Sequence, residues 1–348
     1  MADTDEGFDA ITLEILWSRL ISIADEAAAA LLRTAFSTIV RESNDFATVL
    51  MDANGDSISE NTGGIASFSC ILPKTTKHFL AKFPAENWRP GDCVITNDPW
   101  LATGHLPDIT AVTPIFFQDR LVGFAGSIAH SPDVGGALWS ADCRELFEEG
   151  IRIPPTRIIR AGERQDALLE LFLANVRLPD QVLGDLEAQI TANEVCAARV
   201  QEFLADAALR DLAALGRALH ARADRAMRAA IAALPDGTWS SVIEADGFDE
   251  AVTRIACAVT VSGDRMLLDF AGSSAQVDRG INCVMNYTHA YAVYPVKCAL
   301  DPFTPRNEGS YGAIEVRAPE GSILNPRFPA ACSARQLTGH LLAGAIYK

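Results

Sequence analysis

Residues 97–136 read NDPWLATGHLPDITAVTPIFFQDRLVGFAGSIAHSPDVGG, and the rest of the chain is expected to be built around this stretch. Two mostly apolar runs, residues 109–117 and 121–129, flank a short polar turn at residues 118–120. Apolar runs of this length on either side of a tight turn predict two adjacent strands. Because such a hairpin returns the chain to its starting point, His130 is expected to lie near the loop before the first strand.

That preceding loop contains His105 and Asp108, which flank Leu106 and Pro107. Pro107 favours an extended or turn conformation at the residue before it, so the loop is able to direct both side chains at one point. Two imidazoles and a carboxylate, with coordination positions left open, suit a catalytic divalent metal ion. Such residues at strand ends also occur as hydrogen-bonded structural residues, and the sequence pattern alone leaves both interpretations open.

Several long segments give the chain a resemblance to a known family, that of hydantoinase B and 5-oxoprolinase, which includes the alpha subunits of acetone carboxylase. In that family the GHLPD and AH elements look like the metal-binding core, which carries over to His105, Asp108 and His130. The matching segments span the chain in family order: ITLEILWSRL, RTAFSTIVRESNDFATVLMDANG, RPGDCVITNDPWLATGHLPDIT, IAHSPDVGG, FEEGIRIPP, LANVRLPDQVLGDLEAQI, LLDFAGSSAQVDRGIN and GSILNPRFPAACSAR.

The resemblance implies an ATP-dependent hydrolase that opens a cyclic amide or imide, such as a hydantoin, 5-oxoproline or another lactam. A partner chain resembling hydantoinase A would activate the substrate carbonyl with ATP, so a hetero-oligomer is expected. The ligand types fit manganese, zinc or iron. An alternative with the same ligands is an acetone carboxylase-like, ATP-dependent ketone carboxylase. A non-catalytic scaffold is a third possibility, which predicts no metal and tolerance to His105→Ala.

Two further carboxylates are candidates for catalysis. Asp45 lies in a cluster of charged and amide residues before the strand-like run 46–51, and we expect it to be an added ligand or to orient a ligating histidine. Glu149 precedes a glycine and an extended segment, where burial would raise its pKa and suit it as a general base. The alternatives are that Asp45 pairs with Arg41 or caps a turn and that Glu149 is solvated.

Other polar residues are weaker candidates for the same site. Asp98 follows the strand-like run 93–96 and is a candidate to support the metal loop. Asp133 stands three residues after His130, which repeats the spacing of His105 and Asp108. We interpret His220 as a surface residue. Candidates for contact with a small polar substrate are Asn282, Asn286 and His289.

Composition excludes several classes of partner. The 348 residues carry a net charge of −16, so nucleic acid and anionic membrane surfaces are not expected to bind. No GxxxxGK[ST] phosphate loop occurs, so ATP is expected on the partner chain. Eight cysteines without a CxxC pair predict reduced thiols in a cytoplasmic protein. The acidic start is unlike a secretory signal, and no apolar run is long enough to span a bilayer.

Periodicity predicts an α+β fold. Apolar residues at three- and four-residue steps predict a helix over residues 12–36, and strong helix formers predict one long helix or two stacked ones over residues 179–234. A helix is also expected after Pro73, within residues 70–83. After Pro235 the pattern changes to strands, at residues 239–244, 254–261 and 266–270.

These elements suggest a division into three parts. Residues 1–178 are expected to form an α/β metal-site domain with a mixed sheet, and residues 179–235 a long helical segment. Residues 236–348 are expected to form a β-rich domain. Because relatives are expected to continue beyond residue 348, this last domain is expected to be incomplete, either through truncation of the C-terminus or because the chain is a naturally shorter variant.

Overall fold

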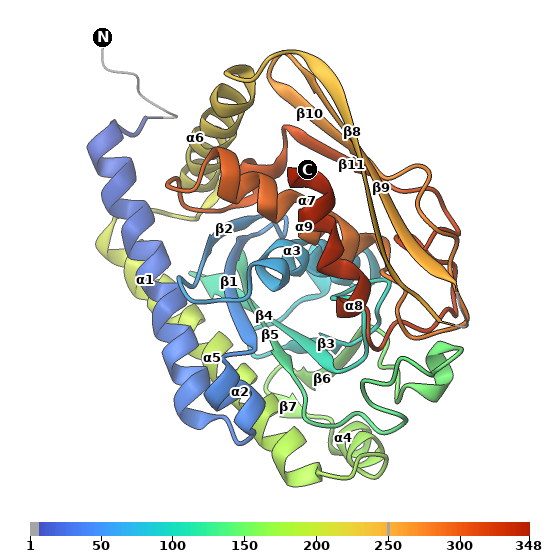
Figure 1. Ribbon diagram of the computed structural model, residues 1–348. Helices are drawn as coiled ribbons and strands as arrows, with labels where there is room; N and C mark the ends of the chain where they lie inside the picture. Colours follow the sequence, from blue (N-terminus) through green and yellow to red (C-terminus); the bar gives the residue numbers. More distant parts are fainter. Residues whose placement is uncertain (1–6, 249–250) are drawn as a thin grey trace.

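The computed structural model describes residues 7–248 and 251–348 and contains two β-sheets with helices around and between them (Figure 1). The expected α+β class is confirmed. The helices are α1 (Ala10–Thr34), α2 (Thr38–Ser43), α3 (Ala66–Lys82), α4 (Asp166–Leu173), α5 (Pro179–Asp206), α6 (Ala213–Ala232), α7 (Met285–Leu300), α8 (Gln336–Gly339) and α9 (Leu341–Tyr347), with 3-10 turns η1 (Ala85–Asn87), η2 (Leu146–Glu148) and η3 (Glu308–Tyr311).

The larger sheet has seven strands in the order β2-β1-β5-β4-β3-β6-β7, and every neighbouring pair is antiparallel. The smaller sheet has the order β11-β10-β9-β8, and its β10–β11 pair is parallel. The mixed sheet is therefore the smaller one. The strands are β1 (Phe46–Asp52), β2 (Ser57–Glu60), β3 (Cys93–Thr96), β4 (Asp108–Phe117), β5 (Arg120–His130), β6 (Thr156–Arg160), β7 (Glu163–Arg164), β8 (Gly237–Asp246), β9 (Val252–Ser262), β10 (Arg265–Asp269) and β11 (Ile314–Arg317).

Helices cover both faces of the larger sheet. Along β1, Phe46 and Leu50 join the core formed with α1 and α5, whereas Val49 and Met51 join the core beneath α3. This alternation follows from the two-residue period of a strand. Figure 1 shows α1 running along one side of the molecule beside α5. The apolar stripe of α1 is thus buried, as the sequence periodicity predicts.

The hairpin of β4 and β5 is the centre of the larger sheet. Its turn residues Gln118 and Asp119 both have positive φ, as two-residue hairpins that match the strand twist require. A β-bulge at Val122 then adds one residue to β5, so that Ile115 faces Gly123. From there the register runs without interruption to Asp108 opposite His130.

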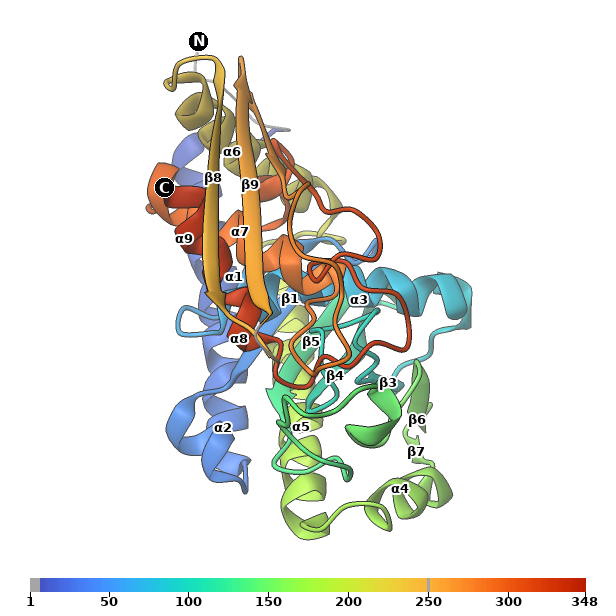
Figure 2. The ribbon, with the colours of Figure 1, turned by 45° about the vertical axis from the view of Figure 1, so that its right-hand side comes forward.

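The smaller sheet packs on helices rather than on the larger sheet. Its inner face, with Ile255 and Leu268, shares a core with α7 and α9 and with Ile71 of α3. Figure 2 shows β8 and β9 as long neighbouring strands with α9 beside them. The helices α3 and α7 therefore connect the two sheets through side-chain packing, and the candidate site lies near their first turns.

Several sequence expectations are refined by the structure. The helix expected after Pro73 begins earlier, at Ala66, and contains Pro73 as a buried residue in its interior. The segment after Pro179 forms two helices, α5 and α6, with Pro179 in the first turn of α5. His220, interpreted as a surface residue, is half-buried. Its Nε2 lies 2.7 Å from the carbonyl oxygen of Ser57, because α6 packs against β2.

The expected change from a helical to a strand pattern near residue 235 coincides with the transition from α6 to β8. The three expected strands correspond to β8, β9 and β10, and β11 adds a fourth that was not expected from the sequence. Whether the chain divides into three domains stays a prediction. The helix α6 contributes to the cores of both sheets, since Leu219 lies in the core formed with α1 and the larger sheet and Met227 in the core of the smaller sheet.

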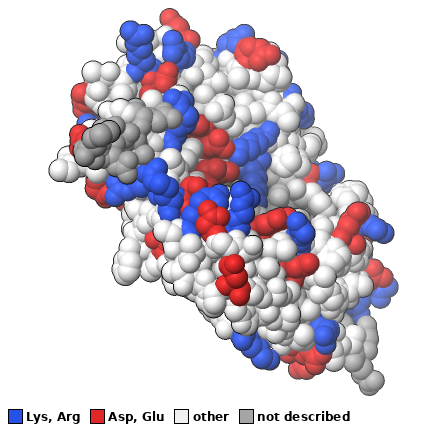
Figure 3. Space-filling view, turned by 90° about the horizontal axis from the view of Figure 1, so that it is seen from above, with Lys and Arg blue, Asp and Glu red and all other residues white. Residues whose placement is uncertain are grey.

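The surface and the thiols agree with the composition. All eight cysteines lie in the described part of the chain as free thiols, and only Cys298 among them is exposed. On the face drawn in Figure 3, lysine and arginine side chains are interspersed with aspartate and glutamate. Across residues 7–248 and 251–348, no helix is both long and apolar enough to cross a membrane.

We expect Gly123→Ala to destabilise the fold. A Cβ at this position would overlap the backbone carbonyl oxygen of Met51 on the neighbouring strand, beside the bulge. Overpacking of this kind costs about 1–3 kcal/mol, measured as the free energy of unfolding in urea. Gly63→Ala is the matched control, because nothing lies near its Cβ position. Equal stabilities of the two variants would contradict the packing described here.

Candidate metal centre

Three strand ends meet at the open end of the β4–β5 hairpin, away from its turn. Asp108 begins β4, His130 ends β5, and the two residues face each other in the ladder. Directly opposed residues of an antiparallel pair project from the same face, so both side chains point to the α3 side of the sheet. Asp45 precedes β1, and its carbonyl oxygen accepts the amide of His130. The expected juxtaposition of the three elements is confirmed.

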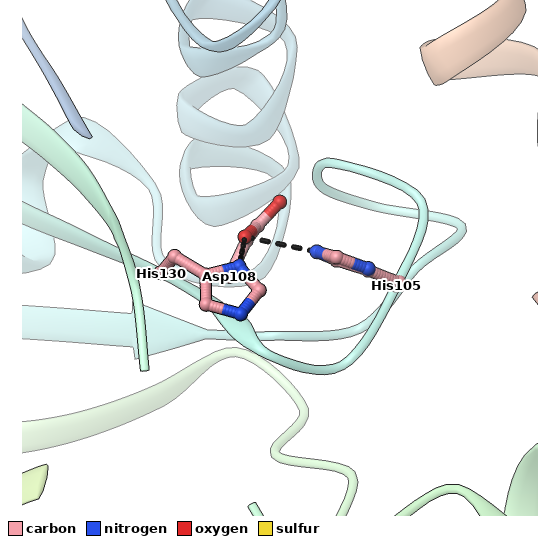
Figure 4. A group of neighbouring side chains, drawn as sticks. All are labelled: His105, Asp108 and His130. Carbon is pink, nitrogen blue, oxygen red and sulfur yellow. Dashed lines mark hydrogen bonds and ion pairs between the residues drawn. The ribbon is translucent and has the colours of Figure 1, made fainter. Parts of the chain in front are cut away.

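The two histidines and Asp108 form one buried cluster (Figure 4). Nδ1 of His130 lies 2.8 Å from Oδ1 of Asp108, and Nε2 of His105 lies 2.9 Å from the same oxygen. One potential ligand atom from each residue lies within 4.8 Å of the other two. These separations match two ligands on adjacent positions of one ion, since donors at about 2.1 Å from a metal lie about 3 Å apart.

The hydrogen bond of His105 to Ser333 leaves its other ring nitrogen, a hydrogen-bond acceptor, facing an acceptor oxygen of Asp108. Nδ1 of His105 lies 3.1 Å from the carbonyl oxygen of Ser333, which only accepts, so Nδ1 carries the proton. Burial, followed by the nearby Arg335, lowers the pKa of His105 to about 4, so the ring is neutral near pH 7. Its Nε2 lone pair then faces Oδ1 of Asp108 and has no hydrogen-bond partner. A cation between the two atoms removes this conflict.

Arg335 holds the second oxygen of Asp108. Its Nη2 donates to Oδ2 of Asp108 at 2.8 Å, and its Nε donates to the carbonyl oxygen of Thr103 at 2.7 Å. The guanidinium also stacks 4.3 Å from the ring centre of Tyr287. Burial opposes ionisation of Asp108, but His105 and Arg335 outweigh it and hold the pKa of this carboxyl well below its usual value. Asp108 is therefore ionised and held in one orientation, as a metal ligand would be.

Asp45 stands at the edge of this cluster. Its Oδ2 lies 3.8 Å from Nδ1 of His130, and its side chain is 31% exposed. Burial, together with the negative charge of Asp108, raises the pKa of Asp45 to about 6. A carboxylate with such a pKa is able to take and return a proton near neutral pH. Its place beside His130 is the one expected from the sequence.

A cavity of about 440 Å³ opens onto the cluster. The three clustered residues and Asp45 line it, together with the side chains Trp139, Tyr287, Tyr291, Arg335 and Gln336 and the start of α3. A metal held by the cluster would therefore be reached by a small molecule. A mostly pre-formed cavity with a few convergent polar groups is the usual form of such a site.

Glu149 lies outside this cavity lining and is 1% exposed. Its Oε1 accepts the backbone amides of Cys332 and Ser333, at 2.6 and 2.7 Å. Ser333 in turn provides the carbonyl that binds His105. The structure thus places Glu149 behind the loop that orients His105, and burial raises its pKa to about 7.

The other candidates from the sequence make structural contacts elsewhere. Asp98 forms an ion pair with Arg152 at 2.5 Å, and Asp133 forms one with Arg177 at 2.7 Å. Both carboxylates therefore fix loops rather than extend the cluster. Asn282 and Asn286 donate to backbone carbonyls, and His289 lies beside Cys70; none of the three lines the cavity.

The residues of the site that were not predicted from the sequence include Arg335, Ser333, Trp139 and Tyr287. Two of them lie in GSILNPRFPAACSAR, a segment that the resemblance had already marked without assigning roles. The aromatic pair gave no signal, because Trp139 lies in an irregular loop and Tyr287 on an ordinary apolar helix face.

Comparison with known proteins assigns the chain to a family. A family model described as hydantoinase B/oxoprolinase matches residues 9–348. The chain belongs to this family. A protein from Pseudomonas sp. (strain NS671), named as a putative subunit of a D-/L-hydantoinase, is 30% identical over 359 residues, which cover 98% of this chain and 61% of that protein. The chain therefore spans about three fifths of that relative.

Two solved structures share the fold. The crystal structure of an ATP-dependent caprolactamase from Pseudomonas jessenii superposes with a TM-score of 0.89 at 26% identity, covering 97% of this chain and 59% of that one. The nucleotide-free structure of an acetone carboxylase gives a TM-score of 0.86 at 21% identity, covering 97% of this chain and 46% of that one. The second match shows the fold alone.

We expect Glu149 to make the stability of the metal-free protein depend on pH. The folded state keeps the Glu149 proton up to about pH 7, whereas the unfolded chain loses it near the ordinary value of 4.5. Between these values the unfolded state binds fewer protons, so stability falls as pH rises, by up to about 3 kcal/mol.

Glu149→Gln keeps an oxygen for the two amides but removes the titration. Urea unfolding at a series of pH values should therefore show a shallower fall in stability for this variant than for wild type between pH 4.5 and 7. Parallel curves for the two proteins would show that the carboxyl group is not responsible.

Proposed function

We propose that this chain is the metal-dependent subunit of an ATP-dependent hydrolase that opens cyclic amides or imides, acting with an ATP-using partner of the hydantoinase A type. The observation that carries the proposal is the buried Nε2 of His105, which lies 2.9 Å from an oxygen of Asp108 without a hydrogen-bond partner. A divalent cation between the two atoms would satisfy both, and the cavity gives a small molecule access to it.

The donor set fits a divalent ion. His105, Asp108 and His130 would hold it, and Ser333 and Arg335 fix the orientation of His105 and Asp108 through their other polar atoms. Partners of this kind are typical of metal ligands and tune their basicity. Nitrogen and oxygen donors suit manganese, zinc or iron. When bound, such an ion supplies Lewis-acid polarisation and makes a coordinated water more acidic.

Two further carboxylates, Asp45 and Glu149, have different roles in this proposal. Asp45 faces the cavity beside His130, and its raised pKa suits it to accept a proton from a water that attacks the substrate carbonyl carbon and to return that proton to the ring nitrogen as it leaves. Glu149 is two contacts away from the cluster, so its role is to position the Ser333 loop.

A partner chain is part of the proposal because the hydrolysis of a cyclic amide requires activation of the substrate. Hydrolysis of an unstrained cyclic amide is slow, and ATP-dependent relatives such as the caprolactamase couple it to nucleotide. This sequence has no phosphate loop of the GxxxxGK[ST] type. The relative from Pseudomonas sp. is named as one subunit of a hydantoinase, which implies a companion chain in that protein. We infer the same arrangement here, with ATP on the companion.

The carboxylase alternative shares the ligand set, and its support is the fold match to acetone carboxylase. Hydrolysis is favoured because the relatives with higher identity are named for hydantoinase and caprolactamase activity. The scaffold alternative leaves the buried conflict between His105 and Asp108 without a physical explanation.

We expect the purified protein to bind about one divalent ion per chain. His105→Ala should lose most of it, because a ligand and its Ser333 contact are removed together. Elemental analysis of dialysed samples gives the metal content. His78→Ala is the matched control, since His78 is an exposed histidine on α3 outside the cavity. Full metal content in a folded His105→Ala variant would contradict the ligand assignment.

We expect the metal-loaded chain, mixed with its ATP-using partner, to hydrolyse a lactam or hydantoin with consumption of ATP. Asp108→Asn should reduce turnover by at least about a hundredfold, since the charge that balances the metal is lost. Coupled ADP release and chromatography of the opened product measure this. Carboxylation of acetone from bicarbonate, with no lactam opening, would instead support the carboxylase alternative.

A further inference from the structure

Helix α5 carries a line of buried polar side chains. Asp185, Gln189 and Asn193 are 4%, 1% and 1% exposed, and they lie four residues apart, so they share one face of the helix. Burying a polar group is costly unless the group is hydrogen-bonded. Oδ1 of Asp185 accepts the amides of Phe36 and Ser37, where the chain passes from α1 to α2. The other two side chains reach the larger sheet.

Both amide side chains donate to main-chain carbonyls of the β4–β5 hairpin. Nε2 of Gln189 lies 2.9 Å from the carbonyl oxygen of Ile109 on β4 and 3.3 Å from that of Ser127 on β5. Nδ2 of Asn193 lies 3.1 Å from the carbonyl oxygen of Ala111 on β4. The helix is therefore bonded to the backbone of both strands, in addition to its apolar packing on them.

These bonds act on the metal cluster from the far side of the sheet. Ile109 follows Asp108 directly, and His130 stands three residues after Ser127. The side chain of Ile109 packs in the core formed with α5, whereas Asp108 projects toward α3. Helix α5 thus contacts the main chain that carries two of the proposed ligands, without contacting the ligands themselves.

The spacing of the two amides matches the spacing of the carbonyls that they bind. Four residues of a helix rise about 6 Å, and two residues of a strand rise about 6.7 Å. Gln189 and Asn193 are four residues apart, and Ile109 and Ala111 are two apart. Because successive carbonyls of a strand point to opposite sides, a shift of one residue would break both bonds. Apolar packing is non-directional and does not fix this translation by itself.

We propose that Gln189 and Asn193 are positioning residues for the metal cluster. They fix the hairpin along α5, so that Asp108 and His130 meet in the geometry that holds an ion. The inference rests on the proposed function for the presence of the metal, and it adds two residues that touch neither the metal nor the substrate. It also gives a physical reason for two buried amides at positions where apolar side chains of similar size would fill the same space.

Gln189→Met tests the inference with a side chain of similar length that is unable to donate. We expect the dissociation constant of the full chain for Mn²⁺, measured by EPR of the free ion, to rise at least about tenfold, as for other groups that orient metal ligands. The midpoint of urea unfolding should stay close to that of wild type, because a hydrogen bond contributes little net stability where an apolar side chain fills its place. Asn193→Leu should behave in the same way, and it provides the test if Gln189→Met does not fold.

Two controls on the same helix separate positioning from packing. Gln201 also donates to a carbonyl oxygen of β4, that of Phe116 at 2.9 Å, but at the turn end of the hairpin. Gln201→Met is therefore the matched substitution and should leave Mn²⁺ affinity unchanged. Val200 is fully buried, so Val200→Ala should lower the urea midpoint by leaving a cavity. It should not alter Mn²⁺ affinity.

Hydrogen exchange of the metal-free protein gives a second measurement that needs no metal. The amide of His130 donates to the carbonyl oxygen of Asp45 at 3.0 Å, so its exchange rate reports how firmly the end of β5 is held. We expect this amide to exchange at least about tenfold faster in Gln189→Met than in wild type. Its rate in Gln201→Met should equal that of wild type.

The outcomes distinguish this inference from the proposed function. Wild-type Mn²⁺ affinity in folded Gln189→Met, or an unchanged exchange rate at His130, would overturn the inference and leave the metal-dependent function standing. An equal loss of affinity in Val200→Ala would also overturn it, because stability alone would then explain the effect. Failure of the wild type to take up Mn²⁺ would remove the proposed function, and the inference with it.

Discussion

The register between β4 and β5 is the constraint on which the candidate site depends. Asp108 faces His130 only because the bulge at Val122 adds one residue to β5. Without it Asp108 would face Ala129, and His130 would project from the opposite side of the sheet, since side chains alternate along a strand. The bulge thus decides whether two of the three proposed ligands share a face. Helices on both faces of the sheet fix this register, because a slip would move the apolar side chains of both strands out of their cores.

Burying this cluster is costly unless its charges are balanced. Asp108 is completely buried, and it contacts Arg335 through one oxygen and both histidines through the other. Arg335 neutralises one negative charge, but it does not resolve the contact between the lone pair of His105 and Asp108. A divalent ion bound between these two groups would resolve that contact. The loop that carries Ser333 and Arg335 is held by Glu149, so four segments far apart in the sequence cooperate at one point.

The clustering of His105, Asp108 and His130 could be predicted from the sequence because the signals are local. His105 and Asp108 lie three residues apart, and the hairpin that returns His130 is visible as two apolar runs around a turn. The apolar stripe of the first long helix follows from an equally local pattern. The α+β class could be predicted from the sequence for the same reason.

The rest of the site depends on contacts that no local pattern encodes. Arg335 reaches Asp108 across more than two hundred residues, and Glu149 reaches Ser333 across nearly as many. Glu149 was expected to be a general base, whereas its carboxylate is directed at backbone amides. No proline signals the bulge at Val122 in the sequence. The left-handed backbone of Trp139 is imposed by its surroundings. Tertiary packing, rather than propensity, determines each of these features.

The most direct test of the account is a crystal structure of the manganese-loaded protein with anomalous diffraction data. The account predicts one anomalous peak, coordinated by a nitrogen of His105, a nitrogen of His130 and a carboxylate oxygen of Asp108, with Asp108 still opposite His130 in the ladder. A peak elsewhere, or none at this cluster in protein that holds manganese in solution, would contradict it.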